Sequence, residues 1–392
     1  MTPRKINDHV FSVGAVDWDR RLFDSLIPLP DGTSYNAYLV RGSEKTALLD
    51  TVDPSKTDIL LENLKGVPSI DYVIAHHAEQ DHSGSIPAVL AKYPQAKVLC
   101  TLKAKGMLMD HLDIAEDKFV TVGDGETVSL GDLTLKFIHT PWVHWPETMS
   151  THLGENNILF SCDFFGSHLA ASDLFVADEG RVYESAKRYY AEIMMPFRTI
   201  IQKNLEKLKT LEIDFIAPSH GPVYNRPEFI LDAYKDWISD TPKNEVVIPY
   251  ISMHGSTQKM VEYLVSALAK RGLRVSQFNL ADADIGKLAI ALVDAATIVV
   301  GTPTVHVGPH PQVAYAAYLA NALRPKLKFA SVIGSFGWGT KAVEQIAAMI
   351  PNLKVEVLPP VICRGLPRKA DFAALDTLAD TIAQKHKSLG LK

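Results

Sequence analysis

The chain has 392 residues, enough to bury more than one hydrophobic core, so two domains are the natural expectation. Apolar residues make up 47% and charged residues 22% of the sequence, which is ordinary for a globular protein and excludes a disordered chain. The net charge of -5 and the lack of a basic cluster argue against nucleic acid as a partner. No stretch approaches the roughly 20 apolar residues of a membrane helix, so no membrane partner is expected either.

The amino terminus, "MTPRKINDHVFSV", lacks the apolar core of a secretory signal, and we therefore expect a cytoplasmic protein. Short apolar runs then alternate with turn-rich pieces. The runs "YNAYLV", "TALLD", "DYVIAHH", "AKVLCT", "LTLKFIHT" and "NILFSCD" predict strands of an α/β or layered β domain with helices outside. The three cysteines form no CxxC pair, and each is expected to be a buried apolar residue.

A polar cluster, "HHAEQDH", directly follows the apolar strand "DYVIA". Side chains at this place emerge in a turn at the end of a strand, which is a common position for an active site. His77 and Glu79 are two residues apart and can face one point, whereas Asp81 and His82 can face a second point. Two adjacent metal ions use these four side chains more easily than one ion does. His76, which precedes them, is expected to support the site rather than to bind metal.

Three more candidate ligands stand at the ends of later apolar segments. Each follows a strand pattern and lies in a turn rich in glycine or proline. They are His144 in "TPWVHWPE", Asp163 in "NILFSCDFFG" and His220 in "FIAPSHGPVY".

The pattern changes after the stretch "DWISDTPKNE", and from there strands and helices alternate. The runs "EVVIPYIS", "RVSQFNL", "AATIVVGTPT", "KFASVIGSFGWG" and "KVEVLPPVIC" predict strands. The runs "STQKMVEYLVSALAKRGL", "VAYAAYLANAL" and "KAVEQIAAMI" predict helices, and Gly272 ends the first of them. This alternation predicts a doubly wound parallel sheet, so we divide the chain into domains 1–243 and 244–392.

A polar loop, "SMHGSTQ", joins the first strand and the first helix of the second domain. Its hydroxyl groups, its backbone N–H groups and the helix N-terminus can surround an anion. The alternative is an ordinary helix cap by Ser256 or Thr257. The domain carries neither GK[ST] nor GxGxxG, which disfavours a nucleoside triphosphate and a Rossmann dinucleotide.

Taken in order, HxExDH, HWPE, CD and SHG resemble the metallo-β-lactamase fold as used by flavodiiron proteins, and the polar loop resembles that of flavodoxin. The resemblance implies an α/β protein with an N-terminal αββα metallo-β-lactamase-like sandwich and a C-terminal flavodoxin-like doubly wound parallel sheet. Zinc hydrolases of this superfamily carry HxHxDH, with a histidine where this chain has Glu79. The carboxylate favours iron or manganese over a zinc hydrolase site.

The family pattern, carried over residue by residue, implies two iron ions with a hydroxo or oxo bridge. The implied ligands are His77, Glu79 and His144 for one ion, Asp81, His82 and His220 for the other, and Asp163 between them. His168 lies five residues past the bridge and is a candidate donor of a proton or hydrogen bond to a bound oxygen species. A packed or capped histidine is the alternative there.

The flavodoxin resemblance implies FMN as a second cofactor, held at three strand ends. Trp338 is expected to be exposed enough to flank the flavin ring. The stretch "VHVGPHP" departs from relatives that carry His-Asn or Tyr-Asn there, so the electron donor stays open. The implied FMN-binding residues are Ser252, Met253, His254, Gly255, Ser256 and Thr257, then Pro303, Thr304, Val305 and His306, and then Ser335, Phe336, Gly337, Trp338 and Gly339.

The resemblance implies an oxidoreductase that reduces O2 to water, NO to N2O, or both, with electrons passed through FMN. Because no CxxC pair is present, the electrons are expected from a separate donor, either rubredoxin or a reduced deazaflavin coenzyme. Family members bring the FMN of one subunit to the irons of another, so a head-to-tail homodimer or a dimer of dimers is expected. Two alternatives are a binuclear zinc hydrolase with a flavodoxin-like appendage, and an electron-transfer module on a metal-free scaffold.

Overall fold

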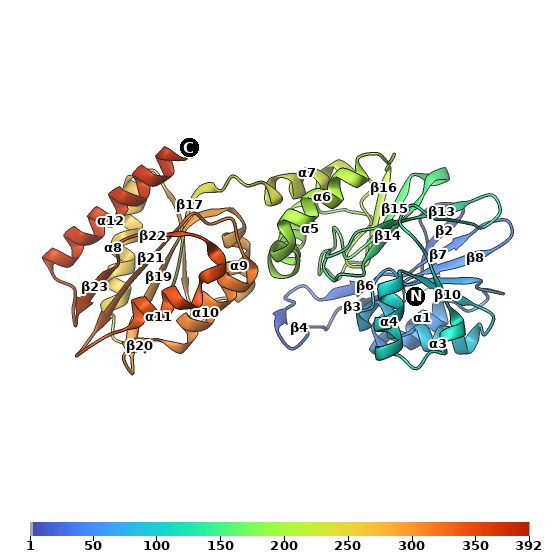
Figure 1. Cartoon of the computed structure of the whole chain (residues 1–392), viewed down its shortest axis with the longest axis horizontal. Helices are drawn as coiled ribbons and strands as arrows, with labels where there is room; N and C mark the ends of the chain where they lie inside the picture. Colours follow the sequence, from blue (N-terminus) through green and yellow to red (C-terminus); the bar gives the residue numbers. More distant parts are fainter. Residues whose placement is uncertain (1–2, 392) are drawn as a thin grey trace. The chain divides into compact units, whose positions relative to one another are not determined.

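The computed structural model describes residues 3–391, and the chain divides into two compact units (Figure 1). One unit comprises the residues up to Tyr190 together with Phe197–Ile238. The other comprises Ser239 onward together with Ala191–Pro196. Among the described helices, none has both the length and the apolar character that a bilayer crossing requires.

Two sheets form the middle layers of the first unit, with strand orders β1-β2-β7-β8-β9-β10-β11 and β12-β13-β14-β15-β16. Apolar residues of both inner faces pack into one core, to which Val40 and Leu49 contribute from the first sheet and Phe137 and Phe160 from the second. The strands are β1 (Arg4–Lys5), β2 (Val10–Ser12), β7 (Tyr38–Arg41), β8 (Thr46–Leu49), β9 (Tyr72–Ile74), β10 (Lys97–Cys100), β11 (Phe119–Thr121), β12 (Thr127–Ser129), β13 (Thr134–His139), β14 (Met149–Leu153), β15 (Ile158–Cys162) and β16 (Phe215–Pro218).

Helices cover the outer face of each sheet, as the αββα prediction requires (Figure 1). A second core joins the first sheet to its helices through Leu60, Val89 and Leu108. On the other side, Tyr234 packs its ring against Phe164 at 5.6 Å. The helices of this unit are α1 (Thr57–Asn63), α2 (Gln80–Ser83), α3 (Ile86–Lys92), α4 (Leu102–His111), α5 (Glu179–Tyr189), α6 (Arg198–Leu208) and α7 (Pro227–Ile238).

Two small antiparallel pairs complete the unit. β3 (Ala15–Asp17) pairs with β6 (Thr33–Tyr35), and β4 (Leu22–Phe23) pairs with β5 (Ile27–Pro28). The short β6 is followed directly by Asn36, which is buried.

Parallel pairing places the ends of distant segments side by side. β9 runs parallel to β8 and to β10, so the turns that follow these strands open at one edge of the first sheet. β15 runs parallel to β16 in the second sheet, so Asp163 and the turn after Pro218 also emerge together. Each of the two sheets therefore contributes polar turns at the ends of its parallel strands.

The second unit is a parallel sheet of order β18-β17-β19-β21-β22, with β23 beside β21. This is the flavodoxin-like order, in which the first strand lies between the second and third. A short antiparallel strand, β20, pairs with the end of β19. The strands are β17 (Lys243–Tyr250), β18 (Arg274–Asn279), β19 (Ala295–Val305), β20 (Gly308–Pro309), β21 (Phe329–Phe336), β22 (Glu356–Val357) and β23 (Val361–Arg364).

The first predicted helix of this unit is confirmed. Its apolar face buries Met260, Leu264 and Leu268, and Gly272 follows the helix with φ +79°, a conformation that favours glycine. The helices of the unit are α8 (Ser256–Lys270), α9 (Ile285–Asp294), α10 (Pro311–Leu323), α11 (Ala342–Met349) and α12 (Lys369–Ser388).

One predicted strand, "KVEVLPPVIC", is wrong as a single element. It forms two short strands, β22 and β23, on either side of Pro359 and Pro360. A proline has no N–H group to donate to a neighbouring strand, which explains the interruption. Residues 100, 162 and 363 are buried free cysteines, as predicted.

Candidate functional site

The seven predicted ligand residues of the first unit lie together in two neighbouring groups. The ligand-type atoms within each group lie within 4.8 Å of one another. The first group is His77, Glu79, His144 and Asp163, and the second is Asp81, His82 and His220.

The carboxylate of Asp163 lies between the two groups. Its Oδ2 is 3.5 Å from Nε2 of His77 and 3.4 Å from Nε2 of His144. Its Oδ1 is 3.0 Å from Nε2 of His82 and 3.3 Å from Nε2 of His220. One carboxylate thus directs one oxygen to each group, which is the arrangement of a bridging ligand.

The remaining carboxylates each serve one group. Oε2 of Glu79 is 3.0 Å from Nε2 of His77 and 3.1 Å from Nε2 of His144. Oδ1 of Asp81 is 3.3 Å from Nε2 of His82, and its Oδ2 is 3.3 Å from Nε2 of the histidine at position 220. The site therefore consists of two half-sites, one for each group, that are joined at the carboxylate of Asp163.

Buried polar atoms without hydrogen bonds indicate that a cation fits this place. Both side-chain oxygens of Asp81 and of Asp163, and Nε2 of His82, are buried and lack a hydrogen-bond partner among the described residues. Buried carboxylates are costly unless a positive charge compensates them. The mixture of histidine and carboxylate oxygen suits iron or manganese better than a soft metal.

The histidines respond to the same negative potential. Burial alone would lower the pKa of His144 and His220, but the negatively charged carboxylates beside them raise the pKa to about 9 and about 10. The pKa of His82 is also raised, and that of His77 lies well above its ordinary value, for the same reason. A site that attracts protons this strongly also attracts a metal cation.

The ring nitrogens that face away from the two groups have partners that orient the rings. Nδ1 of His77 is 2.7 Å from Oε1 of Glu147, and Nδ1 of His220 is 2.7 Å from the backbone oxygen of Ser34. The pKa of Glu147 is lowered, because the hydrogen bond and charge of His77 outweigh the effect of burial. Neither Glu147 nor Ser34 was predicted as a site residue, although Glu147 stands in the HWPE motif.

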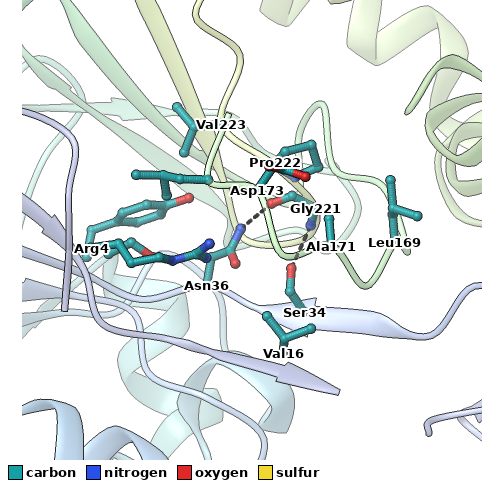
Figure 2. A pocket seen from close by; sticks show the side chains of 13 residues that line it. Arg4, Val16, Ser34, Asn36, Leu169, Ala171, Asp173, Gly221, Pro222 and Val223 are labelled. Atoms are coloured by element: carbon teal, nitrogen blue, oxygen red, sulfur yellow. Dashed lines mark hydrogen bonds between the residues drawn. The ribbon is translucent and has the colours of Figure 1, made fainter. Parts of the chain in front are cut away.

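Ser34, in β6, and Asn36 hold Gly221, the residue after His220, through the hydrogen bonds that Figure 2 shows. Nδ2 of Asn36 donates to the backbone oxygens of Pro218 at 2.8 Å and Gly221 at 2.7 Å. The N–H of Gly221 donates to Oγ of Ser34 at 2.8 Å. A Cβ at Gly221, whose φ is +82°, would meet Oγ of Ser167 at 2.0 Å, so this turn requires glycine.

His76 lies outside both groups, as expected. Its backbone N–H donates to Oδ1 of Asp50 at 2.9 Å, and its Nδ1 is 2.7 Å from Oδ2 of the same residue. Its Nε2 is 2.7 Å from Oγ1 of Thr151. His76 therefore ties the first sheet to the second beneath the site.

His168 lies beside the second group and is buried. Its ring centroid is 4.9 Å from that of His220 and 4.8 Å from that of Tyr189. Its Nδ1 is 2.9 Å from Oγ1 of Thr33, while its Nε2 has no hydrogen-bond partner among the described residues. Burial, followed by the charge of His220, holds its pKa well below the ordinary value, so the ring is neutral.

A separate cavity of about 370 Å³ opens in the second unit, at the carboxyl edge of its parallel sheet. Eleven of the fifteen predicted cofactor-binding residues line it; Gly255, Val305, His306 and Gly339 do not. Gly365 and Leu366, which follow β23, line it and were not predicted. The predicted residues on its wall are Ser252, Met253, His254, Ser256, Thr257, Pro303, Thr304, Ser335, Phe336, Gly337 and Trp338.

The polar loop of this cavity is shaped to expose a helix N-terminus. Gly255, with φ +83°, is the N-cap residue of α8 and has no side chain to cap it, so the alternative of a cap by Ser256 or Thr257 is wrong. Oγ of Ser252 accepts hydrogen bonds from the N–H groups of Gly255 at 3.1 Å and Gln258 at 3.2 Å. The N-terminus of α8 and the Ser252 hydroxyl together form a place that suits an anion such as a phosphate group.

The chain is similar in sequence and in structure to several known proteins. The family described as "ODP family beta lactamase" matches residues 33–221. A nitric oxide reductase of Moorella thermoacetica is 36% identical, over 98% of this chain and 98% of its own length. The rubredoxin oxygen:oxidoreductase from Desulfovibrio gigas superposes with a TM-score of 0.95 at 32% identity, covering 99% of both chains. The flavodiiron protein from Giardia intestinalis superposes with a TM-score of 0.93 at 27% identity, covering 99% of this chain and 98% of its own.

We expect metal binding to release protons. In the metal-free protein at neutral pH, His144 and His220 hold protons, because their pKa values are about 9 and about 10. Metal must displace these protons, so affinity falls as the pH falls below these values. Loading at pH 7 should release at least about two protons per chain, because the pKa values of His77 and His82 are raised as well. Calorimetric titration of the chain with Co²⁺, in two buffers of different ionisation enthalpy, measures the number of protons released.

The matched control is His9→Gln, which removes a histidine that belongs to neither group. This variant should release the same number of protons as the original chain. Binding of Co²⁺ with no proton release in either buffer would contradict the expectation.

Proposed function

The chain belongs to the flavodiiron proteins, and on that premise we propose that it reduces O2 to water, NO to N2O, or both, at a di-iron centre that receives electrons through FMN. The observation that carries this function is the presence, in one chain, of a carboxylate-rich two-metal site and a flavodoxin-like unit with an open cavity. Glu79 stands where zinc hydrolases of the superfamily have a histidine, and a hydrolase needs no electron carrier. A zinc hydrolase is therefore not favoured.

The proposed metal ligands are the seven grouped residues. His77, Glu79 and His144 would hold one iron, Asp81, His82 and His220 the other, and Asp163 would contact both. When bound, the two ferrous ions and FMN supply the electrons and adjacent coordination positions for a diatomic gas. The three carboxylates and one hydroxide would carry four negative charges, which would balance the four positive charges of two ferrous ions.

The proposed FMN site is the cavity at the carboxyl edge of the second sheet. The N-terminus of α8 and the hydroxyl of Ser252 would hold the phosphate group. Trp338 is 86% exposed at the rim and can flank the flavin ring, as its sequence context predicted. The glycine on its amino side, Gly337, also lines the cavity and lets the backbone approach the ring.

We assign His168 a role beside the bound gas. Its neutral ring is buried, its Nδ1 is fixed by Thr33, and its Nε2 is without a partner among the described residues. A buried nitrogen without a partner costs free energy unless something at the site uses it. The proposed use is a hydrogen bond to the gas or to the product water.

The electron donor is proposed to be a separate molecule, and rubredoxin is the first candidate because a similar protein is named a rubredoxin oxygen:oxidoreductase. A reduced deazaflavin coenzyme is the second. A cytoplasmic location belongs to the same proposal and is tested by fractionation. The division into domains 1–243 and 244–392 is tested by limited proteolysis.

A head-to-tail homodimer, or a dimer of such dimers, is proposed as the active form. The metal groups and the FMN cavity belong to different compact units of the chain. Electron transfer between subunits is the solution that the family resemblance implies.

The function is tested first by composition and gas consumption. The purified chain should contain two irons and one FMN, and after anaerobic reduction it should consume O2 or NO. Rubredoxin and a reduced deazaflavin coenzyme are compared as donors at equal concentration. Two zinc ions without flavin, or iron and flavin without consumption of either gas, would overturn the proposed function.

The role of His168 is tested by replacement with phenylalanine. Turnover should fall by at least about tenfold with iron and FMN content unchanged, because the hydrogen bond at the reacting gas is lost. Thr33→Val, which removes the partner of Nδ1, is the matched control and should have a smaller effect. Full turnover in His168→Phe would exclude the role.

Transfer between subunits is tested by mixing two inactive variants. Asp163→Ala should lose iron but keep FMN, and Ser252→Trp should fill the FMN cavity but keep iron. Neither homodimer should reduce gas, whereas subunit exchange should restore a fraction of the activity. A mixture that exchanges subunits and stays inactive, or an active monomer in analytical ultracentrifugation, would refute the arrangement.

A further inference from the structure

The segment between β13 and β14 supplies three groups to the half-site of His77. It carries His144, a member of the first group, and Trp145, whose ring lies edge-on to that of His77 at 4.9 Å. It also carries Glu147, whose side chain is fully buried. The segment between β13 and β14 thus contributes three side chains to the half-site of His77.

Glu147 is fixed on both sides. Its Oε1 is 2.7 Å from Nδ1 of His77 and accepts a second hydrogen bond from the N–H of Ala78 at 3.0 Å. The hydroxyl of Thr101 donates to the backbone oxygen of Glu147 at 2.9 Å. The carboxylate therefore has little freedom to leave the imidazole.

In the other half-site, no carboxylate of the described residues is hydrogen-bonded to Nδ1 of a histidine, although Asp50 lies within 4.8 Å of His82. Nδ1 of His220 faces the backbone oxygen of Ser34, which is a neutral acceptor. Nδ1 of His82 has no hydrogen-bond partner among the described residues. The two half-sites are alike in the atoms that face inward but differ in the groups behind their histidines.

Glu147 also changes the charge balance of the whole site. Glu79, Asp81 and Asp163 supply three negative charges that face the two groups, and Glu147 supplies a fourth from behind His77. A carboxylate hydrogen-bonded to a ligating imidazole raises the basicity of the ligand and stabilises the metal ion in its higher oxidation state. This effect should be stronger for the half-site of His77 than for the other.

We propose that Glu147 is a positioning residue that holds Nε2 of His77 toward the metal and makes the ion in that half-site the harder of the two to reduce. This inference rests on the proposed di-iron site. The two ions would then differ in potential although their inward-facing ligands are nearly the same. Such a difference lets the site accept electrons one at a time in a fixed order.

The test is Glu147→Gln, which keeps the shape and an oxygen acceptor for Nδ1 of His77 but removes the charge. Affinity for Co²⁺, measured by chelator competition on the full chain, should fall by about tenfold to a hundredfold at one of two sites. In a redox titration followed by electron paramagnetic resonance, one one-electron potential should rise by about 59 mV or more, the equivalent of a tenfold change in the ratio of oxidised to reduced ion. A purely structural role would not raise one potential selectively.

Two further variants complete the design. Glu155→Gln, which makes the same chemical change at an exposed carboxylate, should leave both readouts unchanged. Glu147→Asp keeps the charge, so it should weaken Co²⁺ binding but shift the potential less than Glu147→Gln does. It also serves as the test if Glu147→Gln does not fold: wild-type Co²⁺ affinity in Glu147→Asp would then overturn the proposal.

Unchanged Co²⁺ affinity together with unchanged potentials in a folded Glu147→Gln chain would overturn the inference. An equal shift of both potentials would also overturn it, because the proposed asymmetry would be absent. The Co²⁺ measurement does not depend on gas reduction. If the chain binds two metal ions but reduces neither gas, the proposed function fails while the affinity comparison still decides the role of Glu147.

Discussion

The buried carboxylate of Asp163 is the constraint on which the rest of the first unit depends. Four histidine nitrogens lie 3.0–3.5 Å from its two oxygens, and the carboxylate itself is almost fully buried. Negative charge at such a place must be balanced by protons or by metal cations, since desolvation alone would make it unstable. The need to balance this buried negative charge explains both the raised pKa values of the surrounding histidines and the proposed affinity for metal.

The fold meets this requirement by placing strand ends side by side. β9 delivers His77 and Glu79 from the first sheet, while β15 delivers Asp163 from the second. The second unit uses the same principle, because its cavity opens where β17, β19 and β21 end. In both units the apolar strands fix the backbone, and the residues that follow their ends form the metal site or the cavity.

This arrangement explains how much could be predicted from the sequence. Each member of the two metal groups follows or lies near an apolar strand, so spacing and residue type identified them. Glu147 was missed because its role depends on the tertiary approach to His77, seventy residues away, which no local pattern records. Gly365 and Leu366 were missed because the strand before them was predicted as part of a longer one that Pro359 and Pro360 interrupt. α9 and α12 were not predicted, although α12 places Leu375, Leu378 and Ile382 on one buried face.

One short segment, residues 33–36, supports the half-site of His220 through several contacts. Thr33 contacts His168, the backbone oxygen of Ser34 contacts His220, and Asn36 holds the turn that carries His220. Because successive residues of a strand point to opposite faces, a one-residue insertion in β6 would exchange these contacts all at once. The hairpin of β4 and β5 just before it also reaches the site, because the ring of Phe23 lies 5.2 Å from that of His168. Changes of length should therefore be disfavoured both in that hairpin and in β6 during divergence.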